Sequence, residues 1–296
     1  MSAIGQDEIL PKEKILPGIA IFMVLLAAFA AVGYYLTINI GLRRHYMAIL
    51  MWSPGLAAFA TCKIQGISFQ SLGWKWGENR WQYAAYGLPV LYGLVSYGII
   101  WGLGLGGAFN PKYIHGVGEF LGLVGWSDIQ VIAFAVVMFG VVGMIWRVGA
   151  ALGEELGWRG FLTPQLMRIF PFPVTSLIVG LVWAAWHAPI IYWTDYNAGP
   201  YNLHMQMLNF TIVTVGLSFI MTYLLLKSGS VWTATVLHAS HNAYVISLFG
   251  EMTIKYENTR FFMGEFGVIL PAVLAVFACY FWYRANKEGL NGPLNK

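Results

Sequence analysis

Charged residues are scarce in this chain of 296 residues, and that scarcity indicates its class. Only 10% of the residues are Asp, Glu, Lys or Arg, whereas 58% are hydrophobic. A soluble globular domain carries about a quarter charged residues. A core of this size cannot hide the deficit, so much of the surface must face something apolar. The composition therefore predicts a protein embedded in lipid.

Cysteine, clustered positive charge and a leader-like start are also lacking. Two cysteines, Cys62 and Cys279, lie in or beside apolar stretches without metal-ligand spacing. We interpret both as small buried hydrophobic residues and expect no disulfide framework. The net charge of +4 is spread thinly, without the basic block that binds nucleic acid, so we expect no nucleic-acid partner. The polar start, Met1 to Lys14, does not resemble a cleaved signal peptide, and the first apolar run is interpreted as a retained helix.

Eight apolar runs, each bounded by charged residues, Gly or Pro, have the length of a membrane helix, about 20 residues. They cover 17–40, 46–64, 82–104, 129–150, 173–193, 206–227, 230–249 and 264–284. The predicted fold class is therefore all-α: a polytopic membrane protein of about eight transmembrane helices plus an amphipathic helix at 153–169. The segment 68–81, rich in Trp and charge, predicts an interfacial element with Trp74, Trp76 and Trp81 at headgroup level.

Lys and Arg are distributed unevenly over the predicted connections. With eight spans, twelve of the 17 Lys and Arg residues fall on one side together with both termini, and the other five are Arg43, Arg44, Lys112, Lys255 and Arg260. Cytoplasmic loops are enriched in these residues. We therefore expect both termini in the cytoplasm and the long polar connection 105–128 on the opposite side.

Ionisable residues at membrane depth are costly and are functional hypotheses by default. The first set lies in the sequence EELGWR, which begins at Glu154. Glu155 and Arg159 are four residues apart, so they share a helix face and can pair. Glu154 points about 100° away from Glu155, which leaves it free to turn into the bundle and act as a general base. The alternative is a solvated charge pair on an interfacial helix, which is a common arrangement.

Imidazole and carboxamide groups lie in two of the predicted spans. His187 ends the sequence WAAWH, whereas His238, His241 and Asn242 belong to the sequence HASHN. His238 and Asn242 are four residues apart and share a helix face, with His241 near that face. A lone His such as His187 is more often a packing residue, and polar groups in membrane bundles often form interhelical hydrogen bonds. Three polar groups on one helical turn make that simpler interpretation less satisfactory.

Together these groups are sufficient for hydrolysis. A glutamate can activate water, and a histidine can assist proton transfer. A second histidine and an asparagine can donate hydrogen bonds to an oxyanion, where removing one donor costs about 100- to 1,000-fold in rate. The candidate catalytic residues are Glu154, His187, His238 and Asn242.

The three sequences, in this order on successive helices, resemble the EExxxR, FxxxH and HxxxN motifs of the CPBP (CAAX protease and bacteriocin-processing, or Abi) family, which includes the type II CAAX prenyl endopeptidases. The resemblance covers roughly 145–250. It implies an eight-helix fold that hydrolyses a peptide or lipidated peptide within the plasma membrane of a prokaryote. It also divides the chain into N-terminal transmembrane helices and interfacial loops (1–128), a catalytic core (129–250), and a last transmembrane helix with a cytoplasmic tail (251–296).

The resemblance further implies roles for the four candidate catalytic residues. Glu154 matches the water-activating glutamate of the family, and His187 matches the histidine that works with it. His238 and Asn242 match the oxyanion-binding pair.

The same resemblance assigns four supporting positions. Glu155 and Arg159 match the supporting acid and base of the first motif. Trp183 stands where the family usually has Phe, an exchange of bulky aromatic residues that should preserve the wall of the pocket. His241 has no fixed counterpart, and its role stays open.

Three alternative interpretations stay open. The family was first thought to depend on zinc, and Glu154, His187 and His238 could bind that ion. The chain has no HExxH pair to hold zinc on one helix face, so we expect metal-free catalysis without a cofactor. Buried Glu and His residues also form proton relays in transporters, but no inverted repeat is evident. The third alternative is a catalytically silent immunity protein, against which the intact set of candidate catalytic residues argues.

Overall fold

The computed structural model describes residues 12–293, and within them the chain is helical except for loops and one isolated antiparallel bridge between Gly107 and Ile254. Most of the polar start of the chain and Lys296 lie outside the described residues. In chain order the elements are α1 (Lys12–Asn39), α2 (Arg44–Gln65), η2 (Phe69–Leu72), α3 (Asn79–Gly102), α4 (Pro111–Phe120), α5 (Asp128–Val137), η3 (Met138–Val142), α6 (Gly143–Glu155), η4 (Leu156–Leu162), α7 (Thr163–Leu166), α8 (Phe172–Trp193), α9 (Leu203–Ser228), α10 (Val231–His241), η5 (Asn242–Phe249), α11 (Gly250–Met252), α12 (Thr259–Phe262) and α13 (Ile269–Lys287).

The predicted all-α membrane fold is confirmed. Seven helices of the described part are long and apolar enough to cross a membrane. The eighth predicted span, 230–249, coincides with the uninterrupted helical stretch formed by α10, η5 and α11. The chain is therefore a multi-pass integral membrane protein with about eight transmembrane helices.

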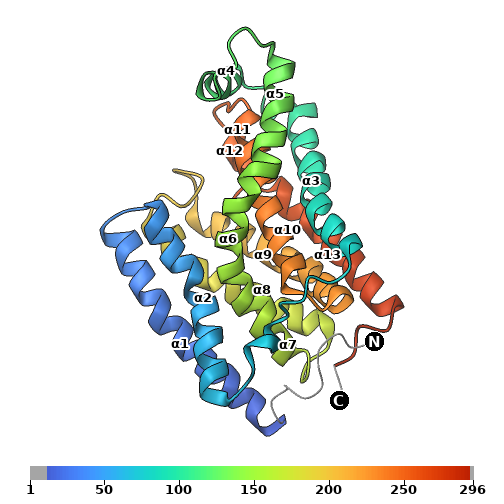
Figure 1. Ribbon diagram of the computed structural model, residues 1–296. Helices are drawn as coiled ribbons and strands as arrows, with labels where there is room; N and C mark the ends of the chain where they lie inside the picture. Colours follow the sequence, from blue (N-terminus) through green and yellow to red (C-terminus); the bar gives the residue numbers. More distant parts are fainter. Residues whose placement is uncertain (1–11, 294–296) are drawn as a thin grey trace.

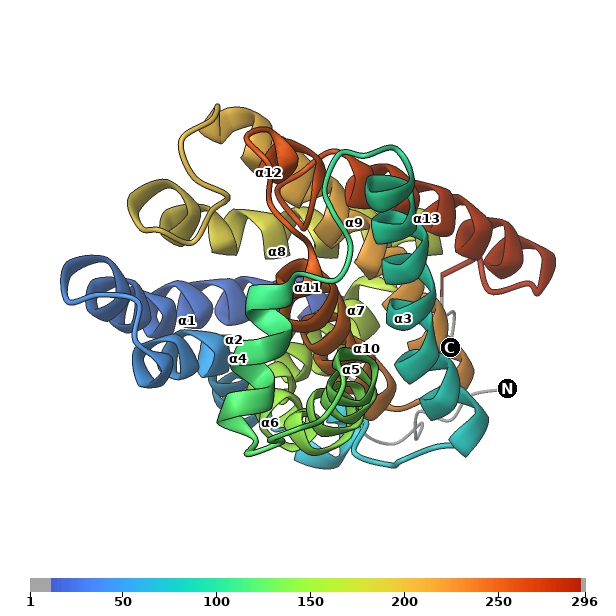
Figure 2. The ribbon, with the colours of Figure 1, turned by 90° about the horizontal axis from the view of Figure 1, so that it is seen from above.

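Helix α10 lies at the centre of the bundle, where it packs against α3, α6 and α9 (Figure 1 and Figure 2). Helix α1 packs against α2 on one flank, and α8, α9 and α13 pack against one another on another. The three predicted motifs lie on α6, α8 and α10 and their continuations. The fold thus gathers the motifs around its central helix.

The longest helical stretch differs from the prediction. The sequence predicts a span at 129–150 and a separate amphipathic helix at 153–169, but the structure has one continuous helix from Asp128 to Leu166. Two π-helical segments, η3 and η4, change its pitch without ending it. The EELGWR part is buried rather than interfacial, because its glutamate and arginine compensate each other inside the bundle.

Two smaller expectations are corrected, the start of the last span and the burial of Cys279. The last span begins at Ile269 rather than near 264, so Glu265 lies in the loop that precedes it. The connection 105–128 contains the short helix α4. Cys62 is buried as expected, whereas Cys279 is exposed, because the packed helices leave its side of α13 uncovered.

A two-residue turn joins α9 to the central helix. Gly229 ends α9 in the left-handed conformation, at φ 65°, which a residue without a Cβ adopts readily. Ser230 then begins α10 by accepting a hydrogen bond from the N–H of Trp232. The Trp232 indole donates to the carbonyl of Trp74 at 2.9 Å, so the Trp-rich segment 68–81 packs on this turn.

Helix α2 approaches α6 and η4 closely because two glycines face it. A Cβ on Gly153 would lie 2.9 Å from the Met51 carbonyl oxygen, and a Cβ on Gly157 would lie 2.4 Å from the Cβ of Pro54. Small residues four positions apart let membrane helices pack at short range. Because the two glycines flank Glu154, this contact fixes the helical turn that carries the EELGWR motif.

Replacing Gly157 by Ala is expected to lower the free energy of unfolding by about 1–3 kcal/mol, the usual cost of overpacking. The new methyl group would lie 2.7 Å from the carbonyl carbon of Pro54, and backbone cannot yield as a side-chain end can. Thermal unfolding of detergent-purified protein, followed by tryptophan fluorescence, measures the effect. Gly98→Ala is the matched control, since nothing lies within 4 Å of its new Cβ. Equal unfolding temperatures for the two variants would contradict the close contact.

Candidate active site

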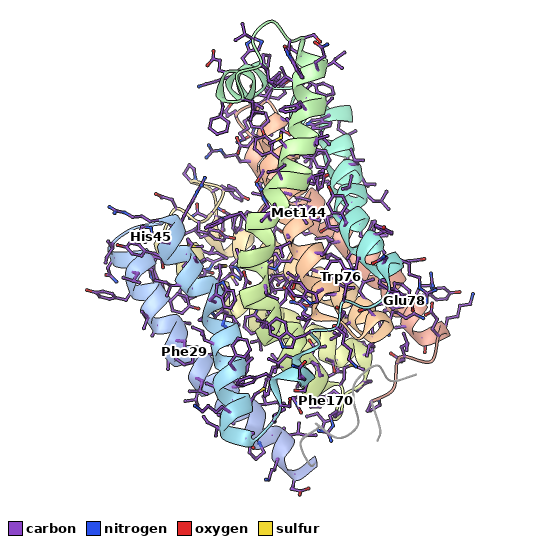
Figure 3. All side chains as sticks on the ribbon, viewed as in Figure 1. Phe29, His45, Trp76, Glu78, Met144 and Phe170 are labelled. Atoms are coloured by element: carbon purple, nitrogen blue, oxygen red, sulfur yellow. The ribbon has the colours of Figure 1, made fainter. Side chains whose placement is uncertain are left out.

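The carboxylate of Glu154 lies inside the bundle at the end of α6, a helix whose first turn is marked by Met144 in Figure 3. Only 3% of Glu154 is exposed. Trp183 on α8 donates from its indole Nε1 to Glu154 Oε2 at 2.8 Å. The other oxygen, Oε1, lies 4.0 Å from Nε2 of His238 on α10. Within the described part of the chain, no Lys or Arg forms an ion pair with this carboxylate.

Glu155, by contrast, is paired with a cation. Nη1 of Arg159 lies 3.0 Å from Glu155 Oε2, and both side chains are fully buried. Nη2 of Arg159 donates to Ser218 Oγ at 2.9 Å, and the guanidinium lies over the Trp183 ring, 4.7 Å from its centroid. The predicted pairing of Glu155 with Arg159 is therefore confirmed.

His238 lies between the two carboxylates. Its Nδ1 is 2.9 Å from Glu155 Oε1, and because an ionised carboxylate can only accept, Nδ1 carries the hydrogen of this bond. The ring also packs edge-on against Trp183, with centroids 5.3 Å apart. These two contacts direct the other nitrogen, Nε2, toward Glu154. Glu155 therefore fixes the orientation of the histidine that faces Glu154.

His187 on α8 has mainly aromatic neighbours. Its Nδ1 lies 3.1 Å from the carbonyl oxygen of Trp183, one helical turn earlier. The rings of Trp186, Tyr196 and Phe210 have their centroids 4.7, 6.0 and 4.8 Å from that of His187. With Nδ1 donating to the backbone, Nε2 has no hydrogen-bond partner among the described residues.

His241 belongs to a second polar group, one helical turn from His238. Its Nδ1 lies 2.8 Å from the hydroxyl of Tyr92 on α3, and its Nε2 lies 3.2 Å from Oε1 of Glu265 in the loop before α13. Burial alone would raise the pKa of the Glu265 carboxyl. The hydrogen bond from His241 and the electrostatic contributions of His187 and His238 nevertheless hold that pKa below its usual range, so Glu265 is ionised at neutral pH.

Six of the eight residues named from the sequence are joined by hydrogen bonds, ion pairs or ring contacts: Glu154, Glu155, Arg159, Trp183, His187 and His238. His187 is not joined to Glu154 by any hydrogen bond or ion pair in the part of the chain that the structure describes, although the family resemblance pairs them. Asn242 is the first residue of η5, and among the described residues only its main-chain carbonyl has a side-chain donor, Ser247. Its carboxamide is therefore available.

A zinc site is not supported by this arrangement. Among residues 12–293, no three His, Cys, Asp or Glu side chains are grouped so that they could hold a metal ion. The set considered from the sequence, Glu154, His187 and His238, is not such a group, because aromatic rings rather than further ligands surround His187. The described residues of this set therefore do not fit a zinc ion.

Two contributions to the site were missed by reasoning from the sequence. Trp183 was assigned to the pocket wall, but its indole N–H, which the Phe usual in the family lacks, donates directly to Glu154. Glu265 was not named at all, because it lies in a loop without helical periodicity. The only available signal was a single acidic residue within the apolar stretch FFMGEFGVILP.

Comparisons with known proteins confirm the resemblance drawn from the motifs. Residues 137–244 match the family described as type II CAAX prenyl endopeptidase Rce1-like. A protein named CAAX prenyl protease 2, from Methanococcus maripaludis, is 29% identical over 132 residues, which are 43% of this chain and 45% of that protein. The chain thus matches slightly less than half the length of this relative. All eight residues named from the sequence lie within the matched range 137–244.

Proposed function

We propose that this chain is an intramembrane endopeptidase of the CAAX prenyl endopeptidase type, in which Glu154 activates the water that attacks the peptide bond. The environment of Glu154 carries the proposal. This buried carboxylate has no Lys or Arg partner within the described residues, and it faces a histidine that a second carboxylate orients. It also lies in the region similar to the Rce1-like family. The proposed substrate is a peptide or lipidated peptide that reaches the site from the bilayer.

A single water molecule can contact both Glu154 and His238. Their nearest atoms are 4.0 Å apart, which is too far for a direct hydrogen bond but suits a bridging water. In the proposed reaction, Glu154 removes a proton while the water oxygen bonds to the carbonyl carbon. The C–N bond then breaks, and the proton passes from Glu154 to the leaving nitrogen. A positioned base of this kind contributes about 100- to 10,000-fold to the rate.

The negative charge that develops on the carbonyl oxygen requires hydrogen-bond donors. We assign this role to Nε2 of His238, in its imidazolium form, and to the carboxamide of Asn242. The two residues are four positions apart on one helical stretch and share a face. The availability of the Asn242 carboxamide supports the assignment. His187, whose Nε2 is also available, is assigned to assist proton transfer to the leaving amine.

Replacing Asn242 by Ala is expected to lower kcat by about 100- to 1,000-fold, the usual effect of removing one oxyanion donor. KM should change little, because the lost hydrogen bond forms only as charge develops. Initial rates over a range of peptide concentrations separate the two constants. Asn286→Ala, an exposed position on α13, is the matched control. A higher KM with an unchanged kcat would instead place Asn242 in ground-state substrate binding.

The proposed function is tested directly with a quenched fluorescent farnesylated CAAX peptide and purified, detergent-solubilised protein. The assay includes Glu154→Ala protein and is run with and without a strong zinc chelator. Cleavage that persists with chelator and is absent from the variant would support the proposal. Loss on chelation, with recovery on adding zinc, would replace glutamate catalysis by a metal-dependent mechanism. Absence of cleavage, with prenylated and unprenylated peptides alike, would favour a silent immunity protein or a transporter.

We also propose that both termini face the cytoplasm, in the plasma membrane of a prokaryote. The excess of Lys and Arg on the side of the termini supports this orientation. Glu154 then lies nearer the cytoplasmic end of the long helix, because it is closer to Leu166 than to Asp128.

A further inference from the structure

The loop between α12 and α13 packs against the candidate active site. Within this 263–268 loop, the ring of Phe266 stacks on Phe210 with centroids 5.4 Å apart and meets Tyr196 edge-on at 6.0 Å. Both of these rings also contact His187. The loop therefore covers the aromatic surroundings of a candidate catalytic residue, although it lies outside the range that is similar to the Rce1-like family.

The main chain of the loop is held in place by hydrogen bonds from outside it and by a tight turn. The carbonyl of Phe266 accepts hydrogen bonds from Asn209 Nδ2 at 2.8 Å and from the Tyr201 hydroxyl at 2.5 Å. A Cβ on Gly267 would lie 2.4 Å from the main-chain nitrogen of Met263, so the turn closes tightly on itself. A side chain carried on this loop is therefore held in a defined position relative to α9.

Glu265 is the charged side chain of this loop. It is largely buried, with 13% of the side chain exposed, and its Oε1 accepts from His241 Nε2. His241 is committed on its other nitrogen to Tyr92. His241 is three residues after His238 on the same helical stretch, and the neighbouring Phe266 stacks on Phe210, which contacts His187, so the charge of Glu265 lies beside the site. No second hydrogen bond to Glu265 forms within the described residues, so one carboxylate oxygen is available.

A peptide that enters this site must exchange water for protein partners. Each main-chain N–H that loses its water in an apolar environment needs a new acceptor. The two carboxylates of the EELGWR motif are already engaged, because Glu154 is assigned to the water and Glu155 is bound to Arg159 and His238. Glu265 is the carboxylate at the site that keeps a free acceptor oxygen.

We propose that Glu265 is a substrate-binding residue, whose free oxygen accepts a hydrogen bond from a main-chain N–H of the bound peptide beside the scissile bond. This inference rests on the proposed peptidase function of the Glu154 site and assigns a further residue to that site. His241 and Tyr92 then serve to hold Glu265 in place rather than to contact the substrate.

Replacing Glu265 by Ala is expected to raise KM by about 10- to 100-fold, the usual effect of losing one hydrogen bond to a charged group. Little change in kcat is expected, since the bond forms in the ground state. Glu265→Gln, which keeps an acceptor oxygen, should recover part of the loss. Glu257→Ala, an exposed acidic position shortly before the loop, is the matched control. A fall in kcat at constant KM would overturn the proposal.

A series of peptides, each N-methylated at one main-chain nitrogen, distinguishes substrate contact from mere support of the fold. At one position next to the scissile bond, methylation should raise the KM of the wild-type protein as much as the Glu265→Ala change does. The Glu265→Ala protein should show no further increase with that peptide, because the same hydrogen bond is already absent. If the increases in KM from methylation and from the Glu265→Ala change multiplied at every position, Glu265 would only support His241. That result would overturn the proposal.

Binding to catalytically inactive protein separates failure of this inference from failure of the proposed function. The farnesylated peptide is titrated by fluorescence anisotropy into Glu154→Ala protein and into the double variant Glu154→Ala with Glu265→Ala. Weaker binding by the double variant, by the same factor as the rise in KM, would support the role of Glu265. Cleavage by wild-type protein with equal binding by the two variants would reject the inference alone. Absence of both cleavage and binding would reject the inference and the proposed function together.

Discussion

Replacing Glu154 by Gln is expected to lower kcat for peptide cleavage by about 100- to 10,000-fold, which is the contribution of a positioned general base. The amide keeps the shape of the side chain, and its oxygen can still accept the hydrogen bond from the Trp183 indole. It cannot take a proton from water at neutral pH. Because binding contacts are retained, KM should change little. Steady-state rates with the farnesylated peptide measure both constants.

The thermal stability of the Glu154→Gln protein, compared with that of the wild-type protein, is the control for this prediction. Thermal unfolding of Glu154→Gln should match that of the wild-type protein or exceed it, because a neutral amide replaces a carboxylate that is only 3% exposed and lacks a Lys or Arg partner in the described part. Normal stability together with wild-type turnover would remove Glu154 from the mechanism. Loss of turnover accompanied by unfolding would call for repetition with Glu154→Asp, which keeps the charge but moves it.

The second large effect is expected at Arg159. Arg159→Met should lower the free energy of unfolding by about 3–5 kcal/mol, because it leaves Glu155 as a buried carboxylate without its cation. The change also removes the hydrogen bond from Arg159 to Ser218 and the contact of its guanidinium with the Trp183 ring. Thermal or denaturant-induced unfolding in detergent, followed by tryptophan fluorescence, measures the change.

Two comparisons make the Arg159 result specific. Arg80→Met removes an arginine whose ion pair with Glu78 is more than half exposed, and such pairs contribute about 0–1 kcal/mol. The double variant Glu155→Leu with Arg159→Met removes both buried charges and should regain much of the lost stability. If Arg159→Met unfolded at the same temperature as Arg80→Met, the buried pair would not stabilise the fold.

The spans were predictable because lipid imposes a simple requirement. A segment that crosses the membrane must be apolar over about 20 residues, and this requirement is visible without knowing its neighbours. The prediction that 129–150 and 153–169 form two separate helices was wrong for a related reason. The charges of Glu155 and Arg159 suggested that this segment faces water, whereas in the structure the two charges pair inside the bundle. Whether a charge is compensated depends on a partner, which hydropathy alone does not report.

The site was predictable where its contacts are local in sequence. The pair of Glu155 and Arg159 follows from a four-residue spacing on one helix. The position of His238 between two carboxylates depends on how α10 packs against α6, and no spacing within one motif encodes that packing. Glu265 depends further on a loop that folds back over α9. These contacts join residues that are far apart in the chain, so they appear only once the helices are assembled.

The unbroken helix from Asp128 to Leu166 has a consequence beyond the chemistry. Its 39 residues extend about 58 Å at 1.5 Å per residue, roughly twice the 30 Å of hydrocarbon that it must cross. Even a tilt of about 40°, the steep end of what membrane helices adopt, leaves a length of roughly 15 Å outside the tails. In Figure 1 the Asp128 end, with α4 beside it, rises above the rest of the bundle. The exposed residues of that end are nevertheless apolar, as at Ile129 and Ile145, whereas residues 151–166 are largely covered by the bundle. The Asp128 half of the helix therefore suits the lipid tails, and the surplus length lies at the Leu166 end, where protein rather than lipid shields the turns around Glu154.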